Sequence, residues 1–167
     1  MKLIKPTLDY QASYLSYIEE LGDEERYPFP LDFDHSDFNA LLSQINDFEQ
    51  GINLPIGYVP SSTYWLMDGD EIIGVSNLRH HLNDLLLEAG GHIGLSTRPS
   101  MRGQGLGIKL LQMTLEQASQ MGIIEVHIHC YADNPASAKM IEACGGVFDS
   151  EFKPDDGPVV LRYVVIN

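Results

Sequence analysis

The feature that most constrains the fold is a short apolar strand that runs into three closely spaced glycines and then into an amphipathic helix. The predicted strand covers residues 92–97, and Arg98-Pro99 stops it because the residue before a proline favours extended geometry. Glycines follow at positions 103, 105 and 107, and apolar residues then recur at helical spacing from 106 to 121. A further strand is predicted at 123–131. This order predicts a right-handed crossover between two parallel strands, a building unit of α/β folds.

The rest of the chain supplies strands and helices in an order that suits such a fold. Strands are predicted at 2–4, 63–67, 71–78, 147–152 and 159–165, and helices at 8–21, from a cap at Ser36 or Asp34 to Gly51, and at 135–144. Asp68-Gly69-Asp70 forms the turn of a hairpin, so the two strands beside it are antiparallel. We therefore predict an α/β fold of the α+β kind, with a central mixed sheet of six to seven strands flanked by helices. No linker divides the chain, so a single domain over residues 1–167 is expected.

The charge of the chain argues against several classes of partner. With 24 acidic and 10 basic residues, its formal net charge is -14, which repels nucleic acid and anionic membranes. No apolar run near the start suits a signal peptide, and none approaches the length of about 18 residues that a membrane span requires. The two cysteines, Cys130 and Cys144, form no disulfide framework. We expect a soluble cytoplasmic protein with no nucleic-acid or membrane partner.

The glycine-rich loop itself predicts an anion-binding site. A strand, a glycine loop and a helix start bring several unpaired backbone N–H groups together at the positive end of the helix dipole. Glycines let the backbone approach a ligand closely, and Arg102 is placed to add a positive charge. The spacing matches neither the Walker pattern GxxxxGK[ST] nor the dinucleotide-binding pattern GxGxxG. A loop that is only a tight turn is the alternative interpretation.

Two segments together resemble the motifs of a known enzyme family. Arg-x-x-Gly-x-Gly at 102–107, after a strand that ends in Thr97-Arg98-Pro99, resembles motif A of the GNAT family of N-acetyltransferases. Asn134-Pro135-Ala136-Ser137, followed by Gly145-Gly146-Val147-Phe148, resembles motif B of the same family. The motifs and the strands between them cover about residues 90–150. The resemblance implies a GNAT-like acyl-CoA N-acyltransferase fold, with acetyl-CoA as cosubstrate and no metal.

The resemblance also implies which residues hold the cosubstrate. Backbone groups of Leu95, Ser96 and Thr97 would pair with the pantetheine arm as if the arm were an added strand. The pyrophosphate would be wrapped by the loop residues Arg102, Gly103, Gln104, Gly105, Leu106 and Gly107. Asn134 and Ser137 would contact the arm or the phosphates from the following helix, although both residue types are also common at helix starts.

Catalysis in this family proceeds by direct attack of an amine on the thioester, which requires a base and a proton donor. The family often places a tyrosine seven residues after the motif-B asparagine as the donor, but Ile141 stands there. His92 and His129 are the candidate bases, because an unperturbed histidine has a pKa of about 6.5. Tyr131 is the phenol nearest to Asn134 along the chain and is the candidate donor. Ordinary structural or surface roles are the alternative for all three.

The sequence thus predicts an N-acetyltransferase that moves an acetyl group to a primary amine on a small molecule or a peptide. The competing hypothesis is a non-catalytic acyl-CoA-binding sensor or interaction module on the same fold, and Ile141 favours it. Exposed strand edges in the family commonly pair into dimers, so a homodimer is a candidate assembly. The acceptor site is expected in the first ninety residues, which carry no diagnostic motif.

Overall fold

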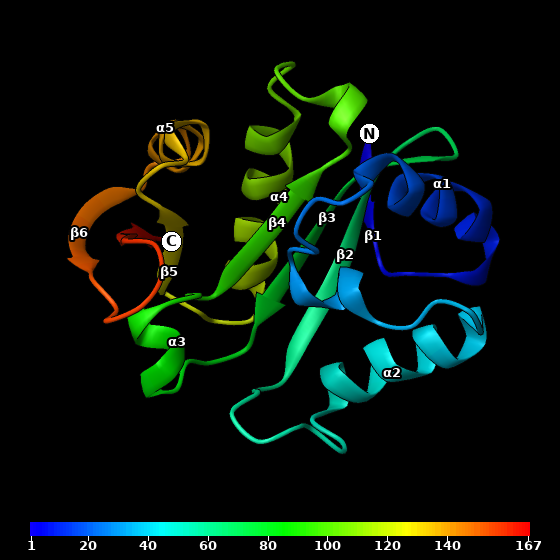
Figure 1. Cartoon of the computed structure of the whole chain (residues 1–167), viewed down its shortest axis with the longest axis horizontal. Helices are drawn as coiled ribbons and strands as arrows, with labels where there is room; N and C mark the ends of the chain where they lie inside the picture. Colours follow the sequence, from blue (N-terminus) through cyan, green and yellow to red (C-terminus); the bar gives the residue numbers. More distant parts are fainter.

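The computed structural model describes residues 1–167, and Figure 1 shows the arrangement of its elements. The strands are β1 (Lys2–Ile4), β2 (Ser61–Asp68), β3 (Glu71–Arg79), β4 (Ile93–Thr97), β5 (Glu125–Tyr131), β6 (Val147–Phe152) and β7 (Val160–Ile166). The α-helices are α1 (Gln11–Leu21), α2 (Phe38–Gln50), α3 (Asp84–Glu88), α4 (Leu106–Gln120) and α5 (Pro135–Ala143). Short 3-10 turns lie at η1 (Leu8–Tyr10), η2 (Phe29–Asp32) and η3 (Pro99–Met101).

The strands form two antiparallel sheets, in the orders β1-β2-β3-β4 and β5-β7-β6. The α/β fold class, with helices flanking the strands, is confirmed, but the expectation of one continuous mixed sheet is corrected. No ladder joins β4 to β5, which meet near their starts, where the His92 N–H donates to the His127 carbonyl oxygen at 2.7 Å. Past this junction the strands lead separately to α4 and α5 (Figure 1). The expected parallel pairing is therefore replaced by two open strand edges.

Helices cover both faces of the first sheet and hold β4 firmly in place. Helices α1 and α2 pack on one face around Trp65, whose ring stacks on Tyr14 with ring centroids 5.5 Å apart. Helix α4 packs on the other face through Leu110 and Leu111, which are fully buried. Helix α5 lies against α4 and β5. Burial of these apolar side chains supplies the main stabilisation of the fold and fixes the strand that enters the glycine-rich loop.

Candidate active site

A cleft of about 1020 Å³ opens where β4 and β5 separate. Its walls come mainly from the loop after α1, the end of β4, the glycine-rich loop, the end of β5 and the first turns of α5, with smaller contributions from the turn after α3 and the start of β7. The structure brings nearly all predicted site residues to this cleft. Those that line it are Leu95, Ser96, Thr97, Arg102, Gly103, Gly105, Leu106, Gly107, His129, Tyr131, Asn134 and Ser137, whereas His92 and Gln104 do not.

The direction of the backbone groups on β4 follows from its ladder with β3. The Arg79 N–H donates to the His92 carbonyl oxygen at 2.8 Å, and the Arg98 N–H donates to the Ile73 carbonyl oxygen at 3.0 Å. The register between the two strands has no shift between these ends. Because the orientation alternates residue by residue in an antiparallel ladder, the even-numbered residues from 92 to 98 turn their backbone groups to β3. The odd-numbered residues turn theirs to the open edge.

The open edge of β4 thus presents polar backbone groups to the cleft. The N–H and C=O of Leu95 and the N–H of Thr97 point away from β3. The Thr97 carbonyl oxygen accepts from Arg102 Nε at 3.1 Å. Ser96, by contrast, is engaged on both sides, because its backbone faces β3 and its Oγ accepts from the Tyr17 hydroxyl at 2.9 Å. An extended chain with its own amide groups could complete this edge as an added strand.

The facing edge of β5 is organised in the same way. The Ala132 N–H donates to the Val159 carbonyl oxygen at 2.8 Å, so the even-numbered residues of β5 face β7. The backbone N–H groups of His129 and Tyr131 therefore face the side on which β4 lies. The cleft lies between two strand edges, one of which runs directly into the glycine-rich loop.

The glycine-rich loop has an open, left-handed backbone. Gly103 and Gly105 have φ angles of +75° and +76°, which glycine adopts without strain, and a Cβ at either position would meet no atom within 4 Å. The space beside Gly103 and Gly105 is therefore free for a ligand. Gly107 differs, since a Cβ there would lie 2.9 Å from Met140 Sδ and would require the Met140 side chain to move. Sequence reasoning grouped the three glycines together, but only the first two leave open space.

The start of α4 offers unpaired donors beside this loop. Gly105 is the N-cap residue, and no side chain caps the helix. The first intrahelical bond is donated by the Lys109 N–H to the Gly105 carbonyl oxygen, at 3.2 Å. The N–H groups of Leu106, Gly107 and Ile108 consequently have no helical partner. Three aligned donors at the positive end of a helix dipole are an arrangement suited to an anion.

Arg102, the cation predicted to meet the phosphates, is already engaged by a carboxylate. Its Nη1 and Nη2 donate to the two carboxylate oxygens of Glu24 at 3.0 and 2.7 Å. This contact holds the pKa of Glu24 below its usual range, chiefly through the hydrogen bonds from the guanidinium. The pair links the glycine-rich loop to the segment that follows α1. Glu24 was not singled out by the sequence, because an ion pair across 78 positions leaves no local pattern.

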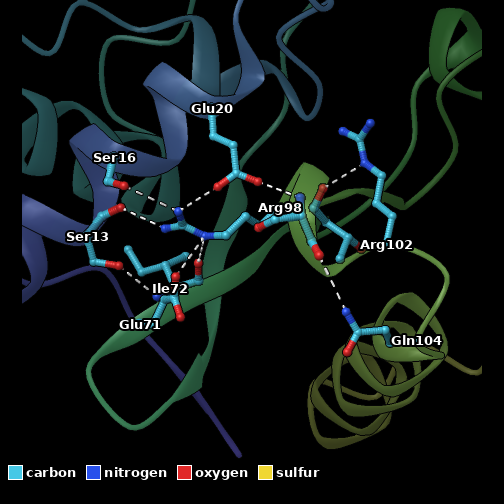
Figure 2. A network of polar contacts seen from close by, with 10 residues as sticks. Ser13, Ser16, Glu20, Glu71, Ile72, Arg98, Arg102 and Gln104 are labelled. Carbon is cyan, nitrogen blue, oxygen red and sulfur yellow. Dashed lines mark hydrogen bonds and ion pairs between the residues drawn. The ribbon is translucent and has the colours of Figure 1, made fainter.

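Arg98 anchors the start of the loop, a role that the sequence did not reveal. Figure 2 shows its guanidinium between α1 and the beginning of β3. It donates to Glu20 at 3.0 Å, to the Ile72 carbonyl oxygen at 2.8 Å and to the Ser13 carbonyl oxygen at 3.1 Å. Glu20 also accepts the Ser100 N–H from the first turn past β4. The network ties the end of β4 to α1, so the loop that follows starts from a fixed point.

The motif-B residues lie at the start of α5, on the opposite wall. Asn134 caps this helix, with its Oδ1 accepting the Ser137 N–H at 3.1 Å. Lys139 also lines the cleft and forms no ion pair, which makes it a cation available to a phosphate. Ile141 is fully buried in the core. The position at which the family often has its proton donor is thus closed to the cleft in this chain.

The two candidate bases lie close together at the junction of β4 and β5. Burial, followed by the neighbouring His127, lowers the pKa of both His92 and His129 to about 4, so both rings are neutral at pH 7. His92 Nδ1 accepts the His127 N–H at 3.0 Å. Both ring nitrogens of His129 are buried without a partner, and its ring lines the cleft. Of the two, only His129 lines the cleft, and both of its ring nitrogens are buried beneath the cleft wall without a partner.

Two phenols flank the same cleft. Tyr131, at the end of β5, is 41% exposed, and burial together with the nearby Glu25 raises its pKa, so it holds its proton at neutral pH. Tyr27, from the loop after α1, reaches over β4: its hydroxyl lies 2.7 Å from the position that a Cβ on Gly94 would occupy. Glu25 lines the cleft beside it.

Comparison with known proteins identifies the family. A family model described as the acetyltransferase (GNAT) family matches residues 16–146, which is most of the chain. The chain belongs to the GNAT family of acetyltransferases. Like other N-acetyltransferases of the GNAT family, it is an acyltransferase that uses acetyl-CoA. A comparison with curated proteins finds no match.

Solved GNAT structures share the fold at low sequence identity. The ribosomal L7/L12 α-N-protein acetyltransferase RimL, solved in complex with coenzyme A, has a TM-score of 0.73 and 17% identity over 98% of this chain and 92% of that chain. Ribosomal-protein-S5-alanine acetyltransferase from Vibrio fischeri has a TM-score of 0.73 and 15% identity, with 99% and 92% covered. A mutant of spermidine N-acetyltransferase SpeG from Vibrio cholerae has a TM-score of 0.68 and 14% identity, with 99% and 95% covered.

Two further features of the structure concern membranes and metals. None of the helices combines the length and apolarity that crossing a membrane requires. No three side chains of histidine, cysteine, aspartate or glutamate come together in a way that suits a metal ion.

Proposed function

We propose that this GNAT protein transfers the acetyl group of acetyl-CoA to a primary amine, with residues 1–167 acting as one acetyltransferase domain. The observation that carries the proposal is the cleft, in which the open edge of β4 leads into a glycine loop and an uncapped helix start. This arrangement fits a ligand with amide groups along an extended arm and a diphosphate at its end. Acetyl-CoA has both.

The proposed binding mode uses backbone groups more than charges. The arm pairs with Leu95 and Thr97, whose amide groups point into the cleft, and the diphosphate sits over Gly103 and Gly105 against the start of α4. Backbone donors suit a chain with a net charge of -14, because they bind an anion without a cluster of cations. Asn134, Ser137 and Lys139 approach from α5.

Proton transfer is proposed to use the groups at the junction of the two sheets. Attack by the amine on the acetyl carbonyl carbon leaves a proton on nitrogen, and His129 is the proposed acceptor because its ring nitrogens have no other partner. Since burial lowers its pKa to about 4, it is a weak base. It accepts the proton once bonding to carbon has made the nitrogen more acidic. His92 supports the junction by accepting the His127 N–H, and Tyr131 is a candidate donor named from the sequence.

The acceptor is proposed to be a cationic amine, either a small polyamine or a peptide amine. Glu25 lines the cleft and forms no ion pair, so its carboxylate is available to an ammonium group. The net charge of -14 attracts cations over a longer range. The structural relatives act on spermidine and on ribosomal proteins, which is consistent with an amine acceptor.

Calorimetry and turnover together test the proposal against the sensor hypothesis, which buried Ile141 favours. Acetyl-CoA is titrated into the protein, and release of free CoA thiol is then followed with a panel of polyamines and peptides. Binding with amine-dependent thiol release supports the enzyme. Binding without release on any amine supports the sensor, and no binding contradicts both.

A further inference from the structure

We propose that Tyr27, on the loop after α1, is the proton donor to the CoA thiolate that leaves during transfer. This inference rests on the proposed function and extends it to a residue outside both sequence motifs. It assigns the role that Ile141 cannot fill, since that side chain is a hydrocarbon with no proton to donate and is fully buried in the core.

The position of the Tyr27 hydroxyl carries the inference. An ideal Cβ built on Gly94 would lie 2.7 Å from Tyr27 Oη and 2.8 Å from Cζ, so the phenol sits directly over the backbone of β4. The ring also lines the cleft. Its hydroxyl forms no hydrogen bond within the protein, so it is free to donate to a bound molecule.

The direction of the proposed arm brings its reactive end to this hydroxyl. The diphosphate is held past the C-terminal end of β4, so an arm that pairs with Thr97 and then Leu95 runs back along the strand and next meets Gly94. The thioester follows the arm. Tyr27 is therefore the phenol that lies over the strand position beside which the sulfur atom is expected.

Tyr131 is placed differently, although it lines the same cleft. It is the last residue of β5, three positions before Asn134, which caps α5. This places its backbone on the wall that leads to α5, and its side chain, which is 41% exposed, lies near Glu25 and Tyr27. Tyr27 instead projects from the other side of the cleft onto β4. The two phenols can therefore be separated by substitution.

The proposed step balances in atoms and electrons. The amine nitrogen forms a bond to the acetyl carbonyl carbon as the bond between that carbon and sulfur breaks, and the sulfur keeps the bonding electron pair. Tyr27 gives its hydroxyl proton to the sulfur, which yields the free thiol, and the phenolate regains a proton from water. The proton of the attacking amine goes to His129 or through water to solvent. No oxidant or metal is required.

Gly94 provides the space that the Tyr27 ring occupies. Its backbone does not require glycine, because its φ is not in the left-handed region. The reason for a glycine at this position is the close approach of the Tyr27 ring, which any side chain would displace. Gly94→Ala should therefore impair catalysis by moving the phenol, and should have no further effect once the hydroxyl has been removed.

The test compares Tyr27→Phe with Tyr131→Phe and with Tyr58→Phe, a matched control whose side chain is 47% exposed and outside the cleft lining. For an amine that the wild type acetylates, Tyr27→Phe should lower kcat by about 10²-fold, the effect expected of a lost proton donor, with the calorimetric Kd of acetyl-CoA unchanged. Tyr58→Phe should keep the wild-type kcat. Gly94→Ala should lower kcat in the wild type but not in Tyr27→Phe.

The possible outcomes separate a failure of the Tyr27 assignment from a failure of the proposed acetyltransferase function. If the wild type transfers acetyl groups and Tyr27→Phe retains its kcat, or if Tyr131→Phe is the more impaired variant, Tyr27 is not the donor. If Tyr27→Phe lowers only the affinity for acetyl-CoA, the residue is a binding residue and the inference is wrong. Absence of turnover in the wild type contradicts the proposed function itself.

Discussion

Arg102 and Glu24 form a two-pronged ion pair that spans the glycine-rich loop and the segment after α1, with nitrogen-to-oxygen distances of 3.0 and 2.7 Å. The carboxylate occupies the donors that a diphosphate would use. The same segment continues to Glu25 and Tyr27, which line the cleft. The contact therefore connects the proposed phosphate site to the proposed acceptor side.

Glu24→Gln should strengthen acetyl-CoA binding, because it releases the Arg102 guanidinium and removes a negative charge near the phosphates. An exposed ion pair contributes about 0–1 kcal/mol, so the expected gain in calorimetric affinity is roughly two- to fivefold. Glu19→Gln, on the exposed side of α1, controls for the change in net charge. Equal affinities for the two variants would show that Arg102 takes no part in binding.

Gly105→Glu should abolish detectable acetyl-CoA binding, because it places a carboxylate where the diphosphate is expected. Gly105→Ala is the matched control, since it bears the same strain at φ of +76° without the charge. A Cβ there meets no atom within 4 Å, so both variants should fold. Calorimetry measures the affinity for acetyl-CoA, and the thermal unfolding midpoint shows whether each variant is folded. Unchanged affinity in the glutamate variant would place the phosphates elsewhere.

Lys139→Gln should weaken acetyl-CoA binding severalfold, with a loss that shrinks as salt is raised. Lys139 lines the cleft as a cation without an ion pair, and attraction between an exposed cation and a phosphate is screened by salt. Lys153→Gln, at an exposed position outside the cleft lining, should leave the affinity unchanged. A loss at Lys139 that does not depend on salt would argue against a phosphate contact.

The buried histidines should make the protein less stable as the pH falls. Burial lowers the pKa of His92 and His129 from 6.5 to about 4, so the folded state resists protonation that the unfolded chain accepts. Their stabilising contribution is complete above pH 6.5 and is lost progressively toward pH 4, by up to roughly 3 kcal/mol for each ring.

This pH dependence is measured by urea unfolding between pH 7.5 and pH 5, a range in which most carboxylates stay ionised. His129→Gln should flatten the decline in the free energy of unfolding, whereas His81→Gln, at an exposed position, should leave it unchanged. If His129→Gln has the same slope as the wild type, the ring is not buried as a neutral group.

The sequence alone predicted those elements whose pattern lies within a short stretch of the chain. Glycine spacing and helical periodicity predicted the loop and α4, and the motif at Asn134 predicted the helix cap of α5. Helix α3 was missed because its five residues are too few to show a period. The Asn83 cap, with Oδ1 accepting the Leu86 N–H at 3.0 Å, was the available signal.

The features that the sequence did not predict depend on contacts between segments that are far apart along the chain. Arg98 looked like a strand stop, but its contacts to α1 cross about eighty positions. The separation of β4 from β5 is a tertiary feature, because strand patterns predict strands and not their partners. The lowered pKa of His129 also follows from burial, which a histidine in an alternating strand does not reveal.

Residue-resolved amide hydrogen exchange, with and without acetyl-CoA, tests most directly whether the open edge of β4 holds the cosubstrate. Acetyl-CoA should slow exchange at the Leu95 and Thr97 amides and at the start of α4. Ser96 should change little, because its amide already faces β3. If Leu95 and Thr97 stay unprotected at saturating acetyl-CoA, the cosubstrate does not bind along the edge of β4.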